Sequence, residues 1–234
     1  MDHFSRLSLL IGEEKLHSLE DKVVAVFGLG GVGGHACEAL ARSGIIHFVL
    51  VDKDQVSESN INRQLIATEK TIGLNKVDVM EERLKSINSK IEAKKYCSFF
   101  SKDNADEFDF AHYDYVVDAI DVVTSKIELI LKCKEHNTNI ISALGCGNKM
   151  DPTKVEVTDL SKTSYDPLAK VMRRELKKYN ITHLKVVYSK EEPIVPLEAL
   201  KEHSKNVPGS TAFVPPVAGI TMASEVIKDL LSLN

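Results

Sequence analysis

The sequence contains few cysteines, and their spacing suits neither metal binding nor disulfide pairing. Its 234 residues include four cysteines, which lie far apart and form no Cys-x-x-Cys pair. Zinc sites and disulfide frameworks need closely or regularly spaced cysteines, so we expect neither. Isolated cysteines are typical of proteins in a reducing cytoplasm. The four are Cys37, Cys97, Cys133 and Cys146.

Long apolar runs and a strong net charge are also missing. Nowhere do about 18 apolar residues follow one another, so we expect no membrane span. Residues 1–14 mix charged and apolar side chains, unlike an export signal. The formal net charge is -4, so no overall field attracts nucleic acid; we expect no DNA partner, and RNA would need a local basic patch. The sequence predicts a soluble cytoplasmic protein.

What the chain does contain is an alternation of apolar strands and helices. Short segments rich in β-branched residues predict buried strands, and segments with apolar residues at helical spacing lie between them. The predicted strands cover residues 22–27, 45–51, 93–97, 115–117 and 139–143, and the predicted helices cover 5–19, 33–43, 76–87 and 124–136. This order indicates an α/β fold, a Rossmann-like, doubly wound, mostly parallel sheet with helices on both faces.

The second half of the chain has a different composition. Residues 150–208 are rich in Lys, Glu and Pro, with two short strand-like segments, VEVTDL and LKVVYS, around a basic helix at 168–179. A chain of this length favours one domain, so we interpret residues 1–234 as a single domain and 150–208 as its elaboration. A last helix is predicted to pack on the sheet through apolar residues at helical spacing. These are Ile220, Ala223, Val226, Ile227 and Leu230.

A glycine-rich turn joins the first predicted strand to the following helix. It places Gly28, Gly30 and Gly33 at the spacing Gly-x-Gly-x-x-Gly. Glycine permits a tight turn and lets backbone N–H groups and a helix N-terminus approach phosphate oxygens. Asp52 ends the next strand, at the offset of about 20 residues where a carboxylate meets ribose hydroxyls. The order predicts a nucleotide site, although tight packing without a ligand uses the same glycines, and NAD and ATP are not distinguished.

The segment after Asp52 favours ATP. Asp54 follows directly, and Asn60, Arg63 and Gln64 lie in a loop beyond the carboxyl end of that strand, where open α/β sheets bind their ligands. A hydride-transfer site has no evident need for an arginine there. A guanidinium, by contrast, matches phosphate oxygens and stabilises charge that develops during attack on the α-phosphorus.

Two further positions complete the predicted phosphate and metal site. Lys76, at the start of a predicted helix, supplies a second cation. Asp121 follows the strand YVVDAI and is the predicted Mg²⁺ ligand, with Asp118 as the alternative. Each residue taken alone is explained as well by a surface charge. Their order along one edge of the sheet supports the joint interpretation.

These motifs together resemble the adenylation motifs of the E1-like superfamily (ThiF, MoeB, HesA) over about the first 150 residues. The resemblance implies ATP and Mg²⁺ binding, attack of a carboxylate on the α-phosphate and release of pyrophosphate. It also implies a homodimer in which an N-terminal arginine, here Arg6, reaches the partner's ATP. The implied nucleotide-binding residues are Gly28, Gly30, Gly31, Gly33, Asp52, Asp54, Asn60 and Gln64, and the implied catalytic residues are Arg63, Lys76, Asp121 and Arg6, with Asp121 on the metal.

Among the branches of this superfamily, the chain resembles the tRNA threonylcarbamoyladenosine dehydratase group. The resemblance lies in its length, in RLSLLIG and NRQLIAT, and in residues 151–178. It implies that ATP activates the threonyl carboxylate of a modified adenosine in tRNA, after which an internal nucleophile closes a ring with loss of water. Sulfur-carrier activators usually carry paired Cys-x-x-Cys zinc ligands, and ubiquitin activators add a catalytic-cysteine domain; this chain has no such pairs and no cysteine after Cys146.

Several alternatives stay open from the sequence. The basic helix bears Lys170, Arg173, Arg174, Lys177 and Lys178, which suit RNA phosphates but also suit a solvated helix face. Cys146, between two glycines, is a candidate nucleophile, and an inert buried thiol is the plainer interpretation. The alternative function is an activator of a small ubiquitin-like sulfur-carrier protein with a sulfur-relay partner. The third alternative is a nucleotide-sensing binding module that catalyses no reaction, and the fourth is an NAD-dependent oxidoreductase.

Overall fold

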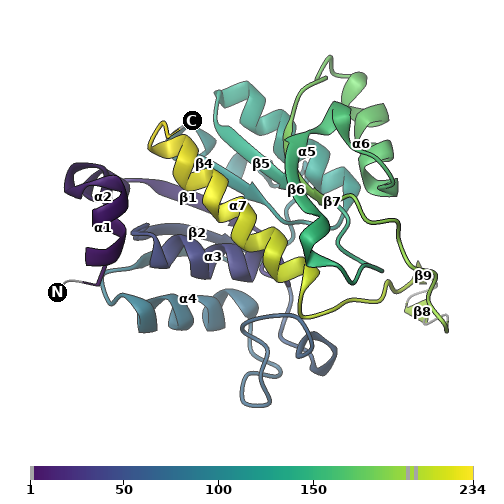
Figure 1. Ribbon diagram of the computed structural model, residues 1–234, viewed down its shortest axis with the longest axis horizontal. Coiled ribbons are helices and arrows are strands. Elements are labelled where there is room, and N and C mark those ends of the chain that lie inside the picture. Colours follow the sequence, from purple (N-terminus) through teal and green to yellow (C-terminus); the bar gives the residue numbers. More distant parts are fainter. Residues whose placement is uncertain (1–2, 199–200, 203–204, 234) are drawn as a thin grey trace.

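A seven-stranded sheet runs through the chain in the order β3-β2-β1-β4-β5-β7-β6 (Figure 1). The computed structural model describes residues 3–198, 201–202 and 205–233. All neighbours in the sheet are parallel except β6, which is antiparallel to β7. The strands are β1 (Val23–Phe27), β2 (His47–Val51), β3 (Glu92–Tyr96), β4 (Tyr115–Asp118), β5 (Asn139–Ala143), β6 (Val155–Asp159) and β7 (Lys185–Ser189). The predicted mostly parallel α/β sheet is confirmed.

Helices cover both faces because the side chains of each strand alternate between two cores. Val24 and Val26 of β1 face a core that includes side chains of three long helices together with Leu19, and Ala25 and Phe27 face the opposite core. The first face carries α3 (Gly33–Arg42), α4 (Lys76–Ile87) and α7 (Val214–Leu230), and the second carries α5 (Val123–His136), with α6 (Pro167–Lys177) in a third cluster beside it. The fold is therefore doubly wound.

The strand order reverses beside β1. β1 pairs with β2 on one side and with β4 on the other, so the chain winds outward in both directions from this point. In open α/β sheets such a switch point leaves a crevice at the carboxyl ends of the strands, and ligands bind there. The glycine turn follows β1 at this edge, and the segment with Asp121 follows β4.

The N-terminal segment differs from the single helix predicted over residues 5–19. Two helices, α1 (Ser5–Ile11) and α2 (Glu13–Glu20), meet at Gly12, whose φ of 86° and ψ of 156° lie outside the helical region. Leu16 and Leu19 of α2 are buried, whereas α1 buries no residue. The apolar spacing continues through Gly12, but glycine accepts the positive φ that ends the first helix.

The last helix packs more closely on α3 than its apolar spacing alone predicts (Figure 1). A Cβ at Gly219 would lie 2.2 Å from the carbonyl oxygen of Val32, so glycine allows the two backbones to touch. Ala223, Val226 and Ile227 are buried as predicted. Ile220 is 52% exposed, so the prediction that it packs on the sheet is wrong, because the close contact of Gly219 with the start of α3 turns Ile220 toward solvent.

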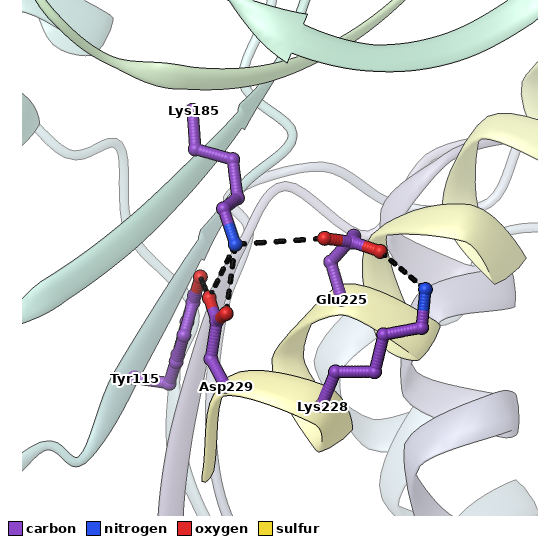
Figure 2. Close-up of polar contacts among 5 residues, drawn as sticks. All are labelled: Tyr115, Lys185, Glu225, Lys228 and Asp229. Carbon is purple, nitrogen blue, oxygen red and sulfur yellow. Dashed lines mark hydrogen bonds and ion pairs between the residues drawn. The ribbon is translucent and has the colours of Figure 1, made fainter. Parts of the chain in front are cut away.

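A polar network joins the far end of α7 to the amino ends of two strands (Figure 2). The hydroxyl of Tyr115 in β4 donates to Asp229 Oδ2 at 2.6 Å. Lys185 Nζ in β7 lies 2.7 Å and 2.8 Å from the two carboxylate oxygens of Asp229, and 3.5 Å from Glu225 Oε2. Lys228 Nζ pairs with Glu225 at 2.7 Å. Residues 115, 185 and 229, far apart in sequence, are thus fixed together.

The elaboration extends the main sheet. The two predicted segments form β6 and β7, and α6 packs between them and α5 through Ala169, Met172 and Leu176. A short hairpin, β8 (Lys201–Glu202) and β9 (Lys205–Asn206), was not predicted. Among the residues that the structure describes, no helix has the length and apolar character needed to cross a membrane.

Candidate nucleotide-binding and active site

A cavity of about 1490 Å³ opens at the carboxyl ends of β1, β2 and β4. Ligand pockets usually enclose roughly 300–1,000 Å³, so this cavity has room for a nucleotide and for part of a second molecule. Most of the nucleotide-site residues predicted from the sequence line this cavity. They are Gly28, Gly30, Gly31, Asp52, Asp54, Asn60, Arg63, Gln64, Lys76 and Asp121. The fold thus gathers residues that span more than 90 positions of sequence.

The glycines of the turn have different tasks. Gly28 has a φ of +89°, and a Cβ there would lie 2.6 Å from the Ala119 oxygen. A Cβ at Gly33 would lie 1.8 Å from the Gly28 oxygen, so Gly33 serves packing and does not line the cavity. At Gly30 the nearest atom would be Gln64 Nε2 at 3.8 Å, so this backbone faces open space. Only at such a position can a ligand approach the main chain.

Asp52 is held ready by two backbone amides. Leu29 N donates to Asp52 Oδ2 at 2.6 Å, and Asp54 N donates to Oδ1 at 2.8 Å. Lys76 Nζ lies 3.9 Å from Asp52 Oδ2 and 3.3 Å from Asp54 Oδ2. Burial raises the pKa of Asp52, while the charge of Lys76 and the two amides act in the opposite direction. The result is an oriented carboxylate with a buried cation beside it.

The loop from 57 to 64 presents one cation and one unpaired acceptor. Asn60 Oδ1 accepts from Ser57 N at 3.2 Å and shapes the turn. Arg63 Nη1 donates to Ser59 O at 2.8 Å and to Asn62 Oδ1 at 2.9 Å, and within the described residues no other guanidinium nitrogen is engaged. Gln64 is 7% exposed.

The side-chain oxygen of Gln64 supplies a test of whether a ligand fits. Among the described residues this buried Oε1 has no hydrogen-bond partner, although it lies in the cavity wall. A buried acceptor without a donor is costly, so a ligand or water hydroxyl or amine is expected to donate to it. The Gln64 oxygen thus suits a ligand with hydroxyl or amine donors, and the cations Arg63 and Lys76 in the same wall suit phosphate oxygens.

The two aspartates at and after the end of β4 have separate environments. Asp121 is exposed and lines the cavity. Asp118, the alternative metal ligand, is 0% exposed, lies 2.9 Å from Lys126 Nζ and does not line the cavity, so it is unable to serve as a ligand there. One carboxylate beside a phosphate site suits Mg²⁺, which keeps several waters and binds one or two carboxylates plus phosphate oxygens.

The far wall of the cavity was not predicted as a unit. It consists of Gly145–Gly147, Leu168 and residues 207–210. Asp166 Oδ2 accepts from Gly145 N at 3.0 Å while its Oδ1 caps α6 through Ala169 N at 2.9 Å. Pro208 and Gly209 come from a segment without periodicity, so no sequence signal indicated them; only the fold brings them here.

Cys146 belongs to this wall as a neutral thiol. Burial raises the pKa of Cys146 to about 12, and the nearby charge of Lys149 lowers it only in part. Its Sγ lies 3.7 Å from the Leu144 oxygen. Since the thiolate is the nucleophilic form, this environment disfavours the nucleophile hypothesis.

Arg6 and the cations of the basic helix lie outside the cavity. Arg6 is exposed on α1. On α6, Lys170, Arg174, Lys177 and Lys178 are exposed. Arg173 is half-buried, and its Nη1 contacts Thr163 Oγ1 and donates to the Leu160 and Thr163 oxygens at 3.3 Å and 3.2 Å. Arg173 thus stabilises the preceding turn. The other four cations are exposed, although Arg174 and Lys178, the residue that follows α6, both pair with Glu175.

Comparison with known proteins agrees with this geometry. The ThiF family model matches residues 4–234. The tRNA threonylcarbamoyladenosine dehydratase of Bacillus subtilis (strain 168) is 42% identical over 242 residues, covering 99% of this chain and 95% of that protein. Crystal structures of E. coli tRNA N6-threonylcarbamoyladenosine dehydratase, TcdA, each 33% identical and covering 99% of this chain and 94% of theirs, give TM-scores of 0.91 in complex with AMP and 0.90 with ATP. The chain therefore belongs to the ThiF family.

Proposed function

We propose that this protein is an ATP-dependent tRNA threonylcarbamoyladenosine dehydratase that works through an adenylate. The observation that carries the proposal is the single cavity that joins the nucleotide-type edge of the sheet to a second wall at Gly145–Gly147. Leu168, in the first turn of α6, lines that second wall, and the exposed cations of α6 begin next to it. A nucleoside inserted in the cavity thus leaves the RNA backbone beside a basic helix. The names and ligands of the relatives described above support this assignment.

In this proposal the cavity residues near the glycine turn, opposite the far wall, each bind a different part of ATP. Asp52 accepts from the ribose hydroxyls, and the open backbone at Gly30 lies along the phosphates, with Gly31 next to it in the cavity wall. Arg63 and Lys76 offset the charge that develops at the α-phosphate and on the leaving pyrophosphate. Asp121 would hold Mg²⁺, which supplies charge neutralisation between phosphate oxygens.

The reaction balances in two steps. A threonyl carboxylate oxygen attacks the α-phosphorus, the bond to the β-phosphate oxygen breaks, and pyrophosphate leaves. An internal nucleophile of the same side chain then attacks the activated carbonyl carbon, and AMP leaves with the former carboxylate oxygen. The sum converts ATP to AMP and pyrophosphate and removes one water from the nucleoside. The enzyme accelerates the second step by orienting the two ends of one side chain.

Cys146→Ala is expected to retain ATP- and tRNA-dependent AMP release within about threefold, because a thiol that stays protonated at neutral pH is a poor nucleophile. The measurement is steady-state AMP release at saturating ATP. A loss of more than about a hundredfold with unchanged ATP affinity would instead support a covalent thioester on Cys146.

Charge reversal on α6 is expected to weaken tRNA binding about tenfold or more. Lys170→Glu combined with Arg174→Glu should also reduce the slope of log affinity against log salt by about 1–2, since each cation that contacts a phosphate releases roughly one counterion. The matched control is Lys15→Glu with Lys90→Glu, the same charge change at exposed sites on other elements. Equal losses in both pairs would contradict a specific RNA path along α6.

The remaining expectations belong to the same proposal. Residues 1–234 act as one domain, with 150–208 as its elaboration. The protein acts as a homodimer, in which Arg6 of one protomer serves the partner's site. Leu9 and Leu10 of the same helix are 84% and 83% exposed and offer apolar surface for that contact. The four free cysteines suit a cytoplasmic location.

The deciding experiment measures AMP and pyrophosphate release from ATP with bulk tRNA, with and without prior RNase treatment. RNase-sensitive release, together with a nucleoside mass that falls by one water, is the expected result, and Asp121→Asn should abolish both. If release requires a small protein ending in Gly-Gly and no RNA, the protein is an activator of a sulfur carrier, and a sulfur-relay partner is then expected.

A further inference from the structure

A buried ion pair lies beneath the segment that carries Asp121. Asp118 at the end of β4 and Lys126 in α5 are both 0% exposed, and Lys126 Nζ lies 2.9 Å from Asp118 Oδ2. Ser142 Oγ of β5 donates to the same oxygen at 2.5 Å. A buried pair often stabilises a fold no more than well-packed apolar residues do, so a further role for these two charges is worth seeking.

The pair holds the two peptide groups that flank the Cα atom of Ile120. The Ile120 N–H donates to Asp118 Oδ1 at 3.2 Å, and Lys126 Nζ donates to the Ile120 oxygen at 3.0 Å. Ile120 immediately precedes Asp121. Within the described residues no hydrogen bond or ion pair engages the Asp121 carboxylate, so the position of that carboxylate depends on its backbone.

The same segment also supports the glycine turn. The Ala119 oxygen would lie 2.6 Å from a Cβ at Gly28, and the Ala119 N–H donates to the Phe27 oxygen at 2.9 Å. A shift of residues 119–121 would therefore move both the predicted metal ligand and the turn at the phosphates.

We infer that Lys126, with Asp118, is a positioning residue that directs the Asp121 carboxylate toward the metal and phosphates in the cavity. This inference rests on the proposed function, in which Asp121 holds Mg²⁺. The Lys126 ammonium contributes to Mg²⁺-dependent nucleotide binding without contacting metal or nucleotide, because this ammonium fixes the Ile120 carbonyl.

The test is calorimetric titration with ATP, in Mg²⁺ and in EDTA. The principal variant is Asp118→Asn with Lys126→Met, which removes both charges, so that neither partner is left buried and unpaired. The amide oxygen still accepts from Ser142, whereas the donor to the Ile120 oxygen is lost. The gain in ATP affinity caused by Mg²⁺ is expected to fall about tenfold, with the affinity in EDTA within about twofold of the parent.

The matched control removes the ion pair between Lys185 of β7 and Asp229 of α7, which lies beside Tyr115 at the amino end of β4 (Figure 2). Asp229→Asn with Lys185→Met is expected to lower the melting temperature and to keep the full Mg²⁺ gain. An equal loss of the gain in this control, or a full gain in the Asp118 and Lys126 variant, overturns the inference and leaves the proposed function standing. A parent protein without any Mg²⁺ gain overturns the role of Asp121 and the inference with it.

If the variant Asp118→Asn with Lys126→Met does not fold, milder substitutions test whether Asp118 and Lys126 position Asp121. Ser142→Ala deletes one hydroxyl and leaves Asp118 with fewer partners, so the Mg²⁺ gain is expected to fall about threefold. Lys126→Arg keeps a charged donor to the Ile120 oxygen, so this variant is expected to keep most of the parent's gain in ATP affinity from Mg²⁺. A Ser142→Ala protein with the parent's Mg²⁺ gain would then contradict the positioning role.

Discussion

Arg63→Ala is expected to slow ATP-dependent AMP formation by about 10²–10³-fold, the usual loss when one group that stabilises transition-state charge is removed. The guanidinium lines the cavity, and its only engaged nitrogen, within the described part of the chain, is Nη1. ATP affinity should fall much less than the rate, because the charge that Arg63 offsets grows during attack on the α-phosphorus. Single-turnover AMP formation at saturating ATP measures this directly.

The control for Arg63 is Arg63→Lys. Lysine keeps the charge but lacks the planar fork, so an intermediate rate is expected. Arg63 is half-buried, and within the described residues its side chain bonds only to Ser59 and Asn62 of its own loop, so the free energy of unfolding should change by less than about 1 kcal/mol in either variant. A loss of ATP affinity with an unchanged rate at saturating ATP in Arg63→Ala would show a role in ground-state binding alone.

Gly28→Ala is expected to lower both stability and ATP affinity. Its φ of +89° is unfavourable for alanine, and its new Cβ would meet the Ala119 oxygen at 2.6 Å and the Ala119 carbonyl carbon at 2.9 Å. The left-handed backbone of alanine should lower the free energy of unfolding by about 1–2 kcal/mol. Separating residue 28 from the Ala119 carbonyl should lower it by about 1–3 kcal/mol more. Because the turn must move to relieve the contact, ATP affinity should fall more than about tenfold.

Gly73→Ala separates the two effects. Gly73 has a φ of +85° but nothing within 4 Å of its Cβ position, and it does not line the cavity. Gly73→Ala should therefore lower the free energy of unfolding only by the cost of a left-handed backbone for alanine, about 1–2 kcal/mol, and keep the parent's ATP affinity. Urea unfolding and calorimetric titration of both variants provide the comparison. Equal destabilisation by the two substitutions would contradict the close approach of Gly28 to Ala119.

Local periodicity predicted the elements well where they are buried and regular. Residues 139–143 were predicted as a strand and form β5, and residues 76–87 were predicted as a helix and form α4. The prediction failed at Gly12, where a continuous apolar pattern is divided by one backbone conformation. It also failed at Ile220, because close approach of two helices at Gly219 determines which face of α7 is buried.

The candidate site shows the same division. The order of the glycine turn, Asp52, Arg63 and Lys76 pointed to one edge of the sheet, since carboxyl ends of parallel strands meet there. The sequence predicted Asp121 as the metal ligand and left Asp118 as the alternative, because the two lie only three positions apart at the end of one strand. Burial beside Lys126 removes Asp118 from the cavity.

By itself the sequence determined the fold class, the nucleotide-type turn and the family resemblance, because these depend on spacing along the chain. Tertiary structure alone decided that Gly145–Gly147 and residues 207–210 form a common wall, that Arg173 is used within the fold, and that Cys146 is a neutral thiol. Each of these depends on burial and on contacts between distant segments. Such contacts arise only when the chain has folded.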